Sequence, residues 1–242
     1  MPRRPTRLLR LVAKLAPAKR SDTGGAATRP RSPRTPGGAG ADVTSIRDPW
    51  HLILLENVVY LADDAARGRA FATLRRRTAL DPEVLQTCPD EILLEACGEG
   101  RMAANQVRKL RRCAELFATV GDPRDLVRLP LPRARRALRR FPGIGEPGAD
   151  KLLLLAGAQP VLALDSNALR VLLRLGYGTE ARAYAKSYRS AQTAAMAELP
   201  DEVETLVGAH HALRAHGQQV CRRTAPQCEE CALRRDCPSA AE

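Results

Sequence analysis

Aromatic residues are scarce in this 242-residue chain, of which Phe, Trp and Tyr together make up only 3%. Long apolar runs are also missing, since none approaches the roughly 18–20 consecutive residues that a membrane-spanning helix needs. No stretch of useful length alternates apolar and polar residues as a half-buried strand does. The chain is instead rich in Leu, Ala and Arg, which favour helices. The sequence therefore predicts an all-α protein that has a sizeable core and no membrane as a partner.

Acidic residues are outnumbered, because 27 Asp and Glu stand against 39 Lys and Arg, giving a net charge of +12. Residues 1–42 hold ten of the basic residues but only Asp22 and Asp42, so this segment carries +8 and the rest of the chain +4. A basic excess favours a polyanionic partner. For the folded part the excess is small, so charge alone is modest evidence for such a partner.

The N-terminal residues 1–44 are predicted to form a basic helix and linker, largely disordered. Residues 3–20 have the apolar spacing of a short helix, which is expected to act as a tether or to dock on the core. Residues 21–41 are rich in Gly, Pro, Ala and Arg and lack apolar periodicity, as linkers do. An organellar transit peptide is the alternative, because no acidic residue precedes Asp22.

The folded part is expected to begin near Ser45. Residues Trp50–Ala66 are apolar nearly all round and predict one central buried helix. Glu56 lies in the middle of this run, where a carboxylate is costly unless it is paired or functional. Further helices are predicted at 82–87, 89–96, 103–119, just after Asp122, at 134–140, 146–156, 168–175, 181–199 and 200–216, with Gly217 as the C′ residue of the last.

A glycine-rich turn separates two of these helices at Phe141–Gly145. Glycines at 143 and 145 allow a tight turn with positive φ and a close approach to another molecule. Unpaired N–H groups at the start of the following helix suit a phosphate. About twenty residues later, Asp165 opens another helix and supplies a carboxylate. Taken alone, these features are equally well explained by an ordinary turn and a helix N-cap.

Seven cysteines are present, and four of them lie in the last 22 residues with the spacing C-x6-C-x2-C-x5-C. The odd total and the absence of a secretory signal favour a metal site in a reducing compartment over disulfides. One C-x2-C pair suits zinc, and four thiolates in a compact loop equally suit a [4Fe–4S] cluster. The other three, Cys88, Cys97 and Cys113, are predicted to be small buried apolar residues.

Several motifs together resemble the endonuclease III family of helix-hairpin-helix DNA glycosylases. They are, in chain order, Phe141-Pro142-Gly143-Ile144-Gly145, Leu164-Asp165, His210-His211 and the cysteine spacing after His216-Gly217. The resemblance extends from about Asp48 to Pro238. It implies a two-lobed all-α fold with a six-helix barrel domain at 45–160 and an iron–sulfur domain at 161–242. It also implies that a [4Fe–4S] cluster is held by Cys221, Cys228, Cys231 and Cys237.

The resemblance implies a base-excision repair enzyme that flips a damaged or mispaired base from double-stranded DNA and hydrolyses its N-glycosidic bond. Asp165 falls where the family's catalytic aspartate lies, and a carboxylate there stabilises an oxocarbenium-like sugar or activates water. Glu56 resembles the acid of the mismatch-specific adenine and thymine branch. Desolvation is expected to raise the pKa of its carboxyl group, as a general acid requires. The alternative for Glu56 is a buried glutamate paired with an arginine.

One departure from the family concerns strand cleavage. Bifunctional members carry a nucleophilic lysine just after the hairpin, and this chain has Pro147 in that register. Lys151 lies four residues on, roughly 6 Å along the helix. The enzyme is therefore predicted to be monofunctional. The alternatives are a glycosylase/AP lyase that uses another lysine such as Lys151, a catalytically silent DNA-binding module, and a zinc-binding helical scaffold.

DNA contacts are predicted from the hairpin, from basic residues and from one apolar wedge. The candidates are Gly143, Ile144, Gly145, Lys151, Arg222 and Arg223 for phosphates and Leu61 for insertion into the base stack. A core position is an equally good interpretation of Leu61. The protein is expected to act as a monomer in the cytoplasm, associated with the nucleoid, and its target base is left open.

Overall fold

The computed structural model describes residues 5–15, 41–60, 62–98 and 102–240. Within these ranges the chain is all-helical and contains no strand, which confirms the predicted fold class. The helices are α1 (Arg7–Leu15), α2 (Pro49–Val58), α3 (Asp64–Thr78), α4 (Pro82–Thr87), α5 (Asp90–Cys97), α6 (Ala103–Val120), α7 (Pro123–Leu126), α8 (Leu131–Leu138), α9 (Glu146–Leu155), α10 (Ser166–Arg174), α11 (Tyr184–Met196) and α12 (Val203–Gln219). None of these helices is long and apolar enough to cross a membrane.

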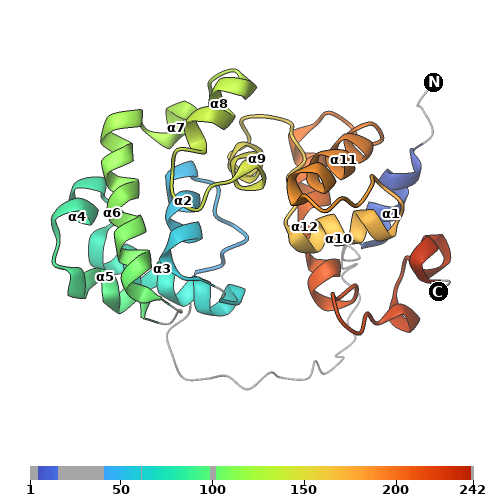
Figure 1. Cartoon of the computed structure of the whole chain (residues 1–242), viewed down its shortest axis with the longest axis horizontal. Coiled ribbons are helices and arrows are strands. Elements are labelled where there is room, and N and C mark those ends of the chain that lie inside the picture. Colours follow the sequence, from blue (N-terminus) through green and yellow to red (C-terminus); the bar gives the residue numbers. More distant parts are fainter. Residues whose placement is uncertain (1–4, 16–40, 61, 99–101, 241–242) are drawn as a thin grey trace, which may run out of the picture.

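The first lobe is built from α2 to α9 around one hydrophobic core (Figure 1). Helix α2 lies at its centre, and Leu52, Ile53 and Leu54 are almost completely buried. Trp50 anchors the start of α2, because its indole N–H donates to the Leu80 carbonyl oxygen at 2.7 Å. A helix that is apolar on every side can be stable only in such a central position.

The predicted helix Trp50–Ala66 is wrong in its length, because the chain leaves the helical conformation between α2 and α3. Val59 is extended, with φ of −140°. The Asp63 carboxylate then starts α3 by accepting a hydrogen bond from the Ala66 N–H at 2.8 Å. An aspartate N-cap competes with helix continuation, so the apolar run is divided into two elements.

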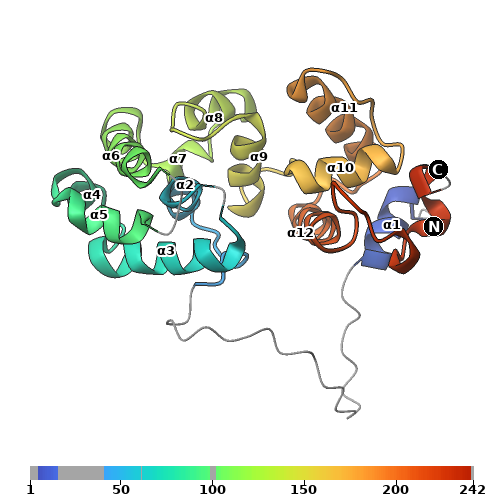
Figure 2. The same ribbon diagram turned by 60° about the horizontal axis from the view of Figure 1, so that its bottom comes forward.

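The second lobe combines both ends of the chain. Helices α10, α11 and α12 and the C-terminal cysteine loop share a core with α1, which lies beside the loop in both views (Figures 1 and 2). Leu8 and Leu11 of α1 are buried in that core. The Leu8 N–H donates to Glu198 Oε2 at 2.7 Å, and Lys14 pairs with Asp236 at 2.6 Å. The basic N-terminal helix is therefore docked on this lobe.

Helix α12 passes through Gly217 and ends at Gln219, so the predicted C′ role of Gly217 is wrong. The glycine instead allows α12 to approach the start of α10. A Cβ atom at this position would lie only 2.6 Å from the Asn167 carbonyl oxygen. Glycine has no Cβ atom, so it allows the backbones of two helices to come into close contact.

Candidate functional site

The predicted hairpin joins α8 to α9 through residues 139–145. Gly143 has φ of +72°, as the tight turn requires, whereas Gly145 has φ of −85°. Only Gly143 therefore confirms the expected positive φ. Gly145 is instead the extended N-cap residue of α9, and Pro147 lies in the first turn of that helix.

Asn57 fixes the hairpin to α2 and was not recognised from the sequence. Its Nδ2 donates to the carbonyl oxygens of Ile53 and Pro142, each at 2.9 Å. A Cβ atom at Gly143 would lie 3.1 Å from Asn57 Oδ1. The clue in the sequence was a single amide side chain near the end of an otherwise apolar helix. Leu61, the predicted wedge, lies outside the described residues.

Asp165 begins α10 as its N-cap residue. Its Oδ1 accepts hydrogen bonds from the N–H groups of Asn167 at 2.9 Å and Ala168 at 2.8 Å. Its Oδ2 lies 3.2 Å from Nε of Arg214, which comes from α12. The carboxylate is 29% exposed, so it is held firmly and still reaches solvent. Its catalytic role stays a prediction.

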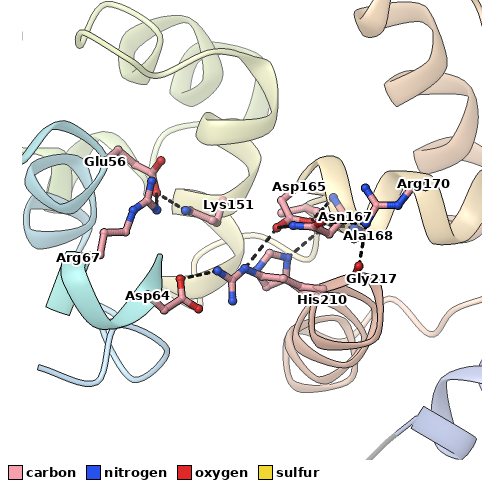
Figure 3. Close-up of polar contacts among 12 residues, drawn as sticks. Glu56, Asp64, Arg67, Lys151, Asp165, Asn167, Ala168, Arg170, His210 and Gly217 are labelled. Atoms are coloured by element: carbon pink, nitrogen blue, oxygen red, sulfur yellow. Dashed lines mark hydrogen bonds and ion pairs between the residues drawn. The ribbon is translucent and has the colours of Figure 1, made fainter. Parts of the chain in front are cut away.

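Glu56 is paired with two cations, Lys151 and Arg67 (Figure 3). Its Oε1 accepts a hydrogen bond from Lys151 Nζ and lies 3.5 Å from Arg67. Burial favours a higher pKa for Glu56, but Lys151 and Arg67 together outweigh it and lower the pKa below its usual value. The expected raised pKa is therefore wrong in this structure, because the sequence did not reveal the two partners.

Replacing Glu56 with Gln is expected to destabilise the protein by roughly 3 kcal/mol at pH 7, because two partly buried cations lose their partner. The lowered pKa means that this contribution is complete above about pH 4.5, the ordinary value for a glutamate. The difference from the unmodified protein should shrink as pH falls further. Urea unfolding across pH 3–7 measures it.

Glu95→Gln is the matched control, because Glu95 forms exposed pairs with Arg76 and Arg77. Its loss should cost less than about 1 kcal/mol. A Glu56→Gln variant as stable as the unmodified protein at pH 7 would contradict the ion-pair assignment and favour a protonated, acid-like Glu56.

A small cavity of about 40 Å³ lies where the two lobes meet. It is lined by Val43, Thr44, Leu52, Leu55, Asp64, Arg67, Lys151, Leu155, His210, His211 and Arg214. Arg67 Nε and His211 Nε2 are buried there without a hydrogen-bond partner among the described residues. The cavity therefore presents polar atoms that a ligand could satisfy.

His210 is buried and structural in character. Its Nδ1 lies 2.9 Å from the Ala163 carbonyl oxygen, at the connection that leads into α10. Burial lowers the pKa of His210 to about 4. The ring is therefore neutral near pH 7 and positions the segment before Asp165 without adding charge.

The four C-terminal cysteines line a single cavity of about 300 Å³. Leu233 N–H donates to Cys231 Sγ at 3.4 Å, and Arg174 donates to Cys221 Sγ at 3.2 Å. Such donors stabilise thiolate ligands. Across the described ranges, no three His, Cys, Asp or Glu side chains are arranged to hold a single metal ion.

Arg170 connects the cysteine loop to the aspartate helix. It donates to the carbonyl oxygens of Cys221 at 2.9 Å and Gly217 at 2.7 Å and to Asn167 Oδ1 at 3.0 Å. Arg222 and Arg223 lie beside it on an open groove of about 820 Å³ that also includes Asn167. Their predicted phosphate contacts would therefore lie next to Asp165.

The predicted DNA-contact residues come from three parts of the structure. Lys151 points into the cavity between the lobes and pairs with Glu56, whereas Arg222 and Arg223 lie on the groove of the second lobe. Gly143, Ile144 and Gly145 form the hairpin of the first lobe. Sequence reasoning missed Asp64, Arg67 and Arg214, whose positions along the chain gave no signal.

No protein-family model matches the chain. Its sequence is similar to that of Endonuclease III from Bacillus subtilis (strain 168), with 24% identity over 188 residues that cover 77% of this chain and 79% of that protein. A solved non-covalent Endonuclease III–DNA complex matches with a TM-score of 0.65 at 23% identity, covering 83% and 88% of the two chains. A thermostable thymine-DNA glycosylase matches with a TM-score of 0.67 at 16% identity, covering 82% and 87%. The structural similarities at these identities establish the fold.

Proposed function

We propose that this chain, which has the sequence pattern and the fold of the endonuclease III-like helix-hairpin-helix superfamily, is a base-excision repair DNA glycosylase. The observation that carries this proposal is Asp165, a partly exposed carboxylate fixed at the start of α10 beside the cavity between the lobes. A duplex hides the glycosidic bond, so the target nucleotide must leave the base stack to reach such a site.

At about 40 Å³ the cavity between the lobes has room for only a few waters, so the groups that line it would meet an extruded base only after the lobes move apart. Breaking the glycosidic bond leaves positive charge on the sugar, which the Asp165 carboxylate stabilises while it orients water. Arg67 Nε–H, unpartnered within the described ranges, can donate to a carbonyl of the base. Because Glu56 is ionised, the Lys151 ammonium beside it is the group that hydrogen-bonds the departing base.

We further propose that the enzyme is monofunctional. Pro147 has no amine, so it cannot attack the sugar. Lys151 Nζ is held in an ion pair with Glu56, so it would have to leave this contact to attack the sugar. Both observations favour hydrolysis by water over a Schiff-base intermediate.

The test is incubation of the protein with duplexes that contain uracil, mispaired thymine, mispaired adenine or oxidised bases. We expect free base and an alkali-labile site from at least one duplex, and no covalent protein–DNA adduct after borohydride reduction. Pro147→Lys restores a lysine at the family's register on a helix that tolerates it, so this variant should give a trapped adduct.

An adduct formed by the unmodified protein and abolished in Lys151→Met would reject the monofunctional proposal. That result would support the glycosylase/AP lyase alternative. Lys186→Met is the matched control, because Lys186 lies on α11 and lines neither the cavity nor the groove.

We propose that Cys221, Cys228, Cys231 and Cys237 hold a [4Fe–4S] cluster. A single zinc ion needs four sulfurs at about 2.3 Å from one centre, and among the described residues no three His, Cys, Asp or Glu side chains are placed to hold one ion, although all four thiols line one cavity. The donors from Leu233 and Arg174 suit thiolate ligands of a cluster. Base hydrolysis requires no electron transfer, so the cluster's role is to hold the loop that presents Arg222 and Arg223.

A further inference from the structure

A single arginine joins the aspartate of the candidate site to the opposite lobe. Arg214 lies on α12 in the second lobe, and its side chain is 20% exposed. Its Nε lies 3.2 Å from Asp165 Oδ2, and its Nη2 lies 2.7 Å from Asp64 Oδ1 on α3 of the first lobe. One planar guanidinium thus contacts two carboxylates from different lobes.

The contact with Arg214 holds the second carboxylate oxygen of Asp165. Its Oδ1 is already held by two backbone N–H groups at the start of α10, so that oxygen cannot turn away. Its Oδ2 receives Arg214 and, more weakly, the Asn167 side-chain amide at 3.3 Å. The orientation of the carboxylate therefore depends on where Arg214 is held.

Charge keeps Arg214 in place. Partial burial disfavours the charged guanidinium, but the hydrogen bond to Asp64 and the carboxylates of Asp64 and Asp165 hold the pKa of Arg214 above its usual value. The pair with Asp64 crosses the junction beside the cavity, which Asp64 and Arg214 both line. A change in the separation of the lobes would therefore move the guanidinium relative to Asp165.

We propose that Arg214 is the positioning residue of this site, orienting Asp165 and making that orientation depend on closure of the two lobes through Asp64. The inference rests on the proposed glycosylase function. Arg214 brings a cation from α12 to the carboxylate of Asp165. A guanidinium provides charge and direction, yet it stays protonated and cannot form a Schiff base.

The experiment measures kcat and KM for base release by Arg214→Gln, Arg214→Lys and Asp64→Asn, together with affinity for a duplex carrying a tetrahydrofuran abasic analogue. Arg214→Gln should lower kcat by about 10- to 100-fold, since misplacing a reacting group by about 1 Å has an effect of that size. Its affinity for the analogue should stay within about twofold. Arg214→Lys should recover most of kcat, and Asp64→Asn should lower it by about three- to tenfold.

Arg189→Gln is the matched control. Arg189 on α11 pairs with Glu146 on α9, so this variant also removes an arginine–carboxylate pair between the lobes, one that involves neither Asp64 nor Asp165. Its kcat should equal that of the unmodified protein. Equal losses in Arg189→Gln and Arg214→Gln would mean that general weakening of the lobe junction is responsible, and would overturn the proposal.

Two further outcomes would overturn it. In one, Arg214→Gln keeps kcat within twofold of the unmodified protein. In the other, it weakens binding and reduces the salt dependence of binding by about one phosphate contact, which would make Arg214 a DNA-backbone ligand.

A urea-unfolding cycle of Arg214→Gln and Asp165→Asn tests the contact without activity. If the change in the free energy of unfolding of the double variant differs from the sum of the two single changes, the contact is supported. If it equals the sum, the contact is rejected. Inactivity of the unmodified protein on every lesion would reject the glycosylase function and, with it, catalytic positioning. Urea unfolding therefore tests the contact between Arg214 and Asp165, and base release by the unmodified protein tests the glycosylase function.

Discussion

Replacing Asp165 with Asn should reduce the rate of base release by about 10³-fold while affinity for an abasic-analogue duplex is retained. Asparagine is as good an N-cap residue as aspartate, so α10 should keep its start and the bonds from Asn167 and Ala168. The variant loses the negative charge opposite the developing sugar cation and, with it, the ion pair between Asp165 and Arg214. Single-turnover release of base with the best lesion duplex measures the effect.

Asp81→Asn provides the matched control. Asp81 caps α4 by accepting hydrogen bonds from the N–H groups of Glu83 and Val84, the same pattern that Asp165 makes on α10. Asp81 does not line the cavity between the lobes. Asp81→Asn should therefore retain full activity.

Unchanged base release in Asp165→Asn would remove the carboxylate from the mechanism. Binding of DNA by the unmodified protein without release of any base would instead support the catalytically silent DNA-binding module. In the first case the unmodified protein releases base, and in the second case it does not.

Replacing Cys231 with Ala should abolish cluster assembly and greatly reduce the yield of folded protein. Cys231 packs against the core of the second lobe and receives the Leu233 N–H. Loss of one of the four proposed ligands would expose the remaining thiols and free a loop that Arg170 and Arg174 hold in place. Visible absorbance, iron content and thermal unfolding measure the outcome. The unmodified protein should contain about four irons per chain.

Cys88→Ala is the control, because Cys88 is half-buried in the first lobe and distant from the cysteine cavity. It should retain iron and colour. Zinc at about one ion per chain in the unmodified protein, with no iron, would reject the cluster and favour the zinc scaffold.

The sequence predicted those parts of the structure that are local in the chain. The helix starts at Asp122 and Asp165 could be predicted, because each aspartate lies within three residues of the N–H groups that donate to it. The cysteine spacing was readable because its four residues lie on one short segment. Such features depend on the nearest neighbours and need no knowledge of packing.

Glu56 illustrates what could not be predicted. Its burial was evident from the apolar run around it, so a raised pKa followed. The cations that reverse the shift come from α3 and α9, and Lys151 is 95 residues away. The sign of a pKa shift is decided by such partners, and their positions are set by helix packing.

The role of Gly217 could not be predicted either, because it also depends on a residue from another helix. Its position near the end of a helix suggested a terminating role, but the decisive neighbour is the Asn167 carbonyl oxygen on α10. No local pattern distinguishes a glycine required by a neighbouring helix from one that ends its own helix.

The docking of α1 on the second lobe has a consequence for synthesis of the chain. All helices of the first lobe lie between Pro49 and Leu155, so this lobe can fold while the ribosome is still translating the remainder. The second lobe must wait, because Leu8 and its partner Glu198 are separated by 190 positions. Leu8 and Leu11 consequently remain exposed until late in translation, and contacts of such long range form slowly. The N-terminal helix thus gains its binding surface only after the segment that contains Glu198 has emerged.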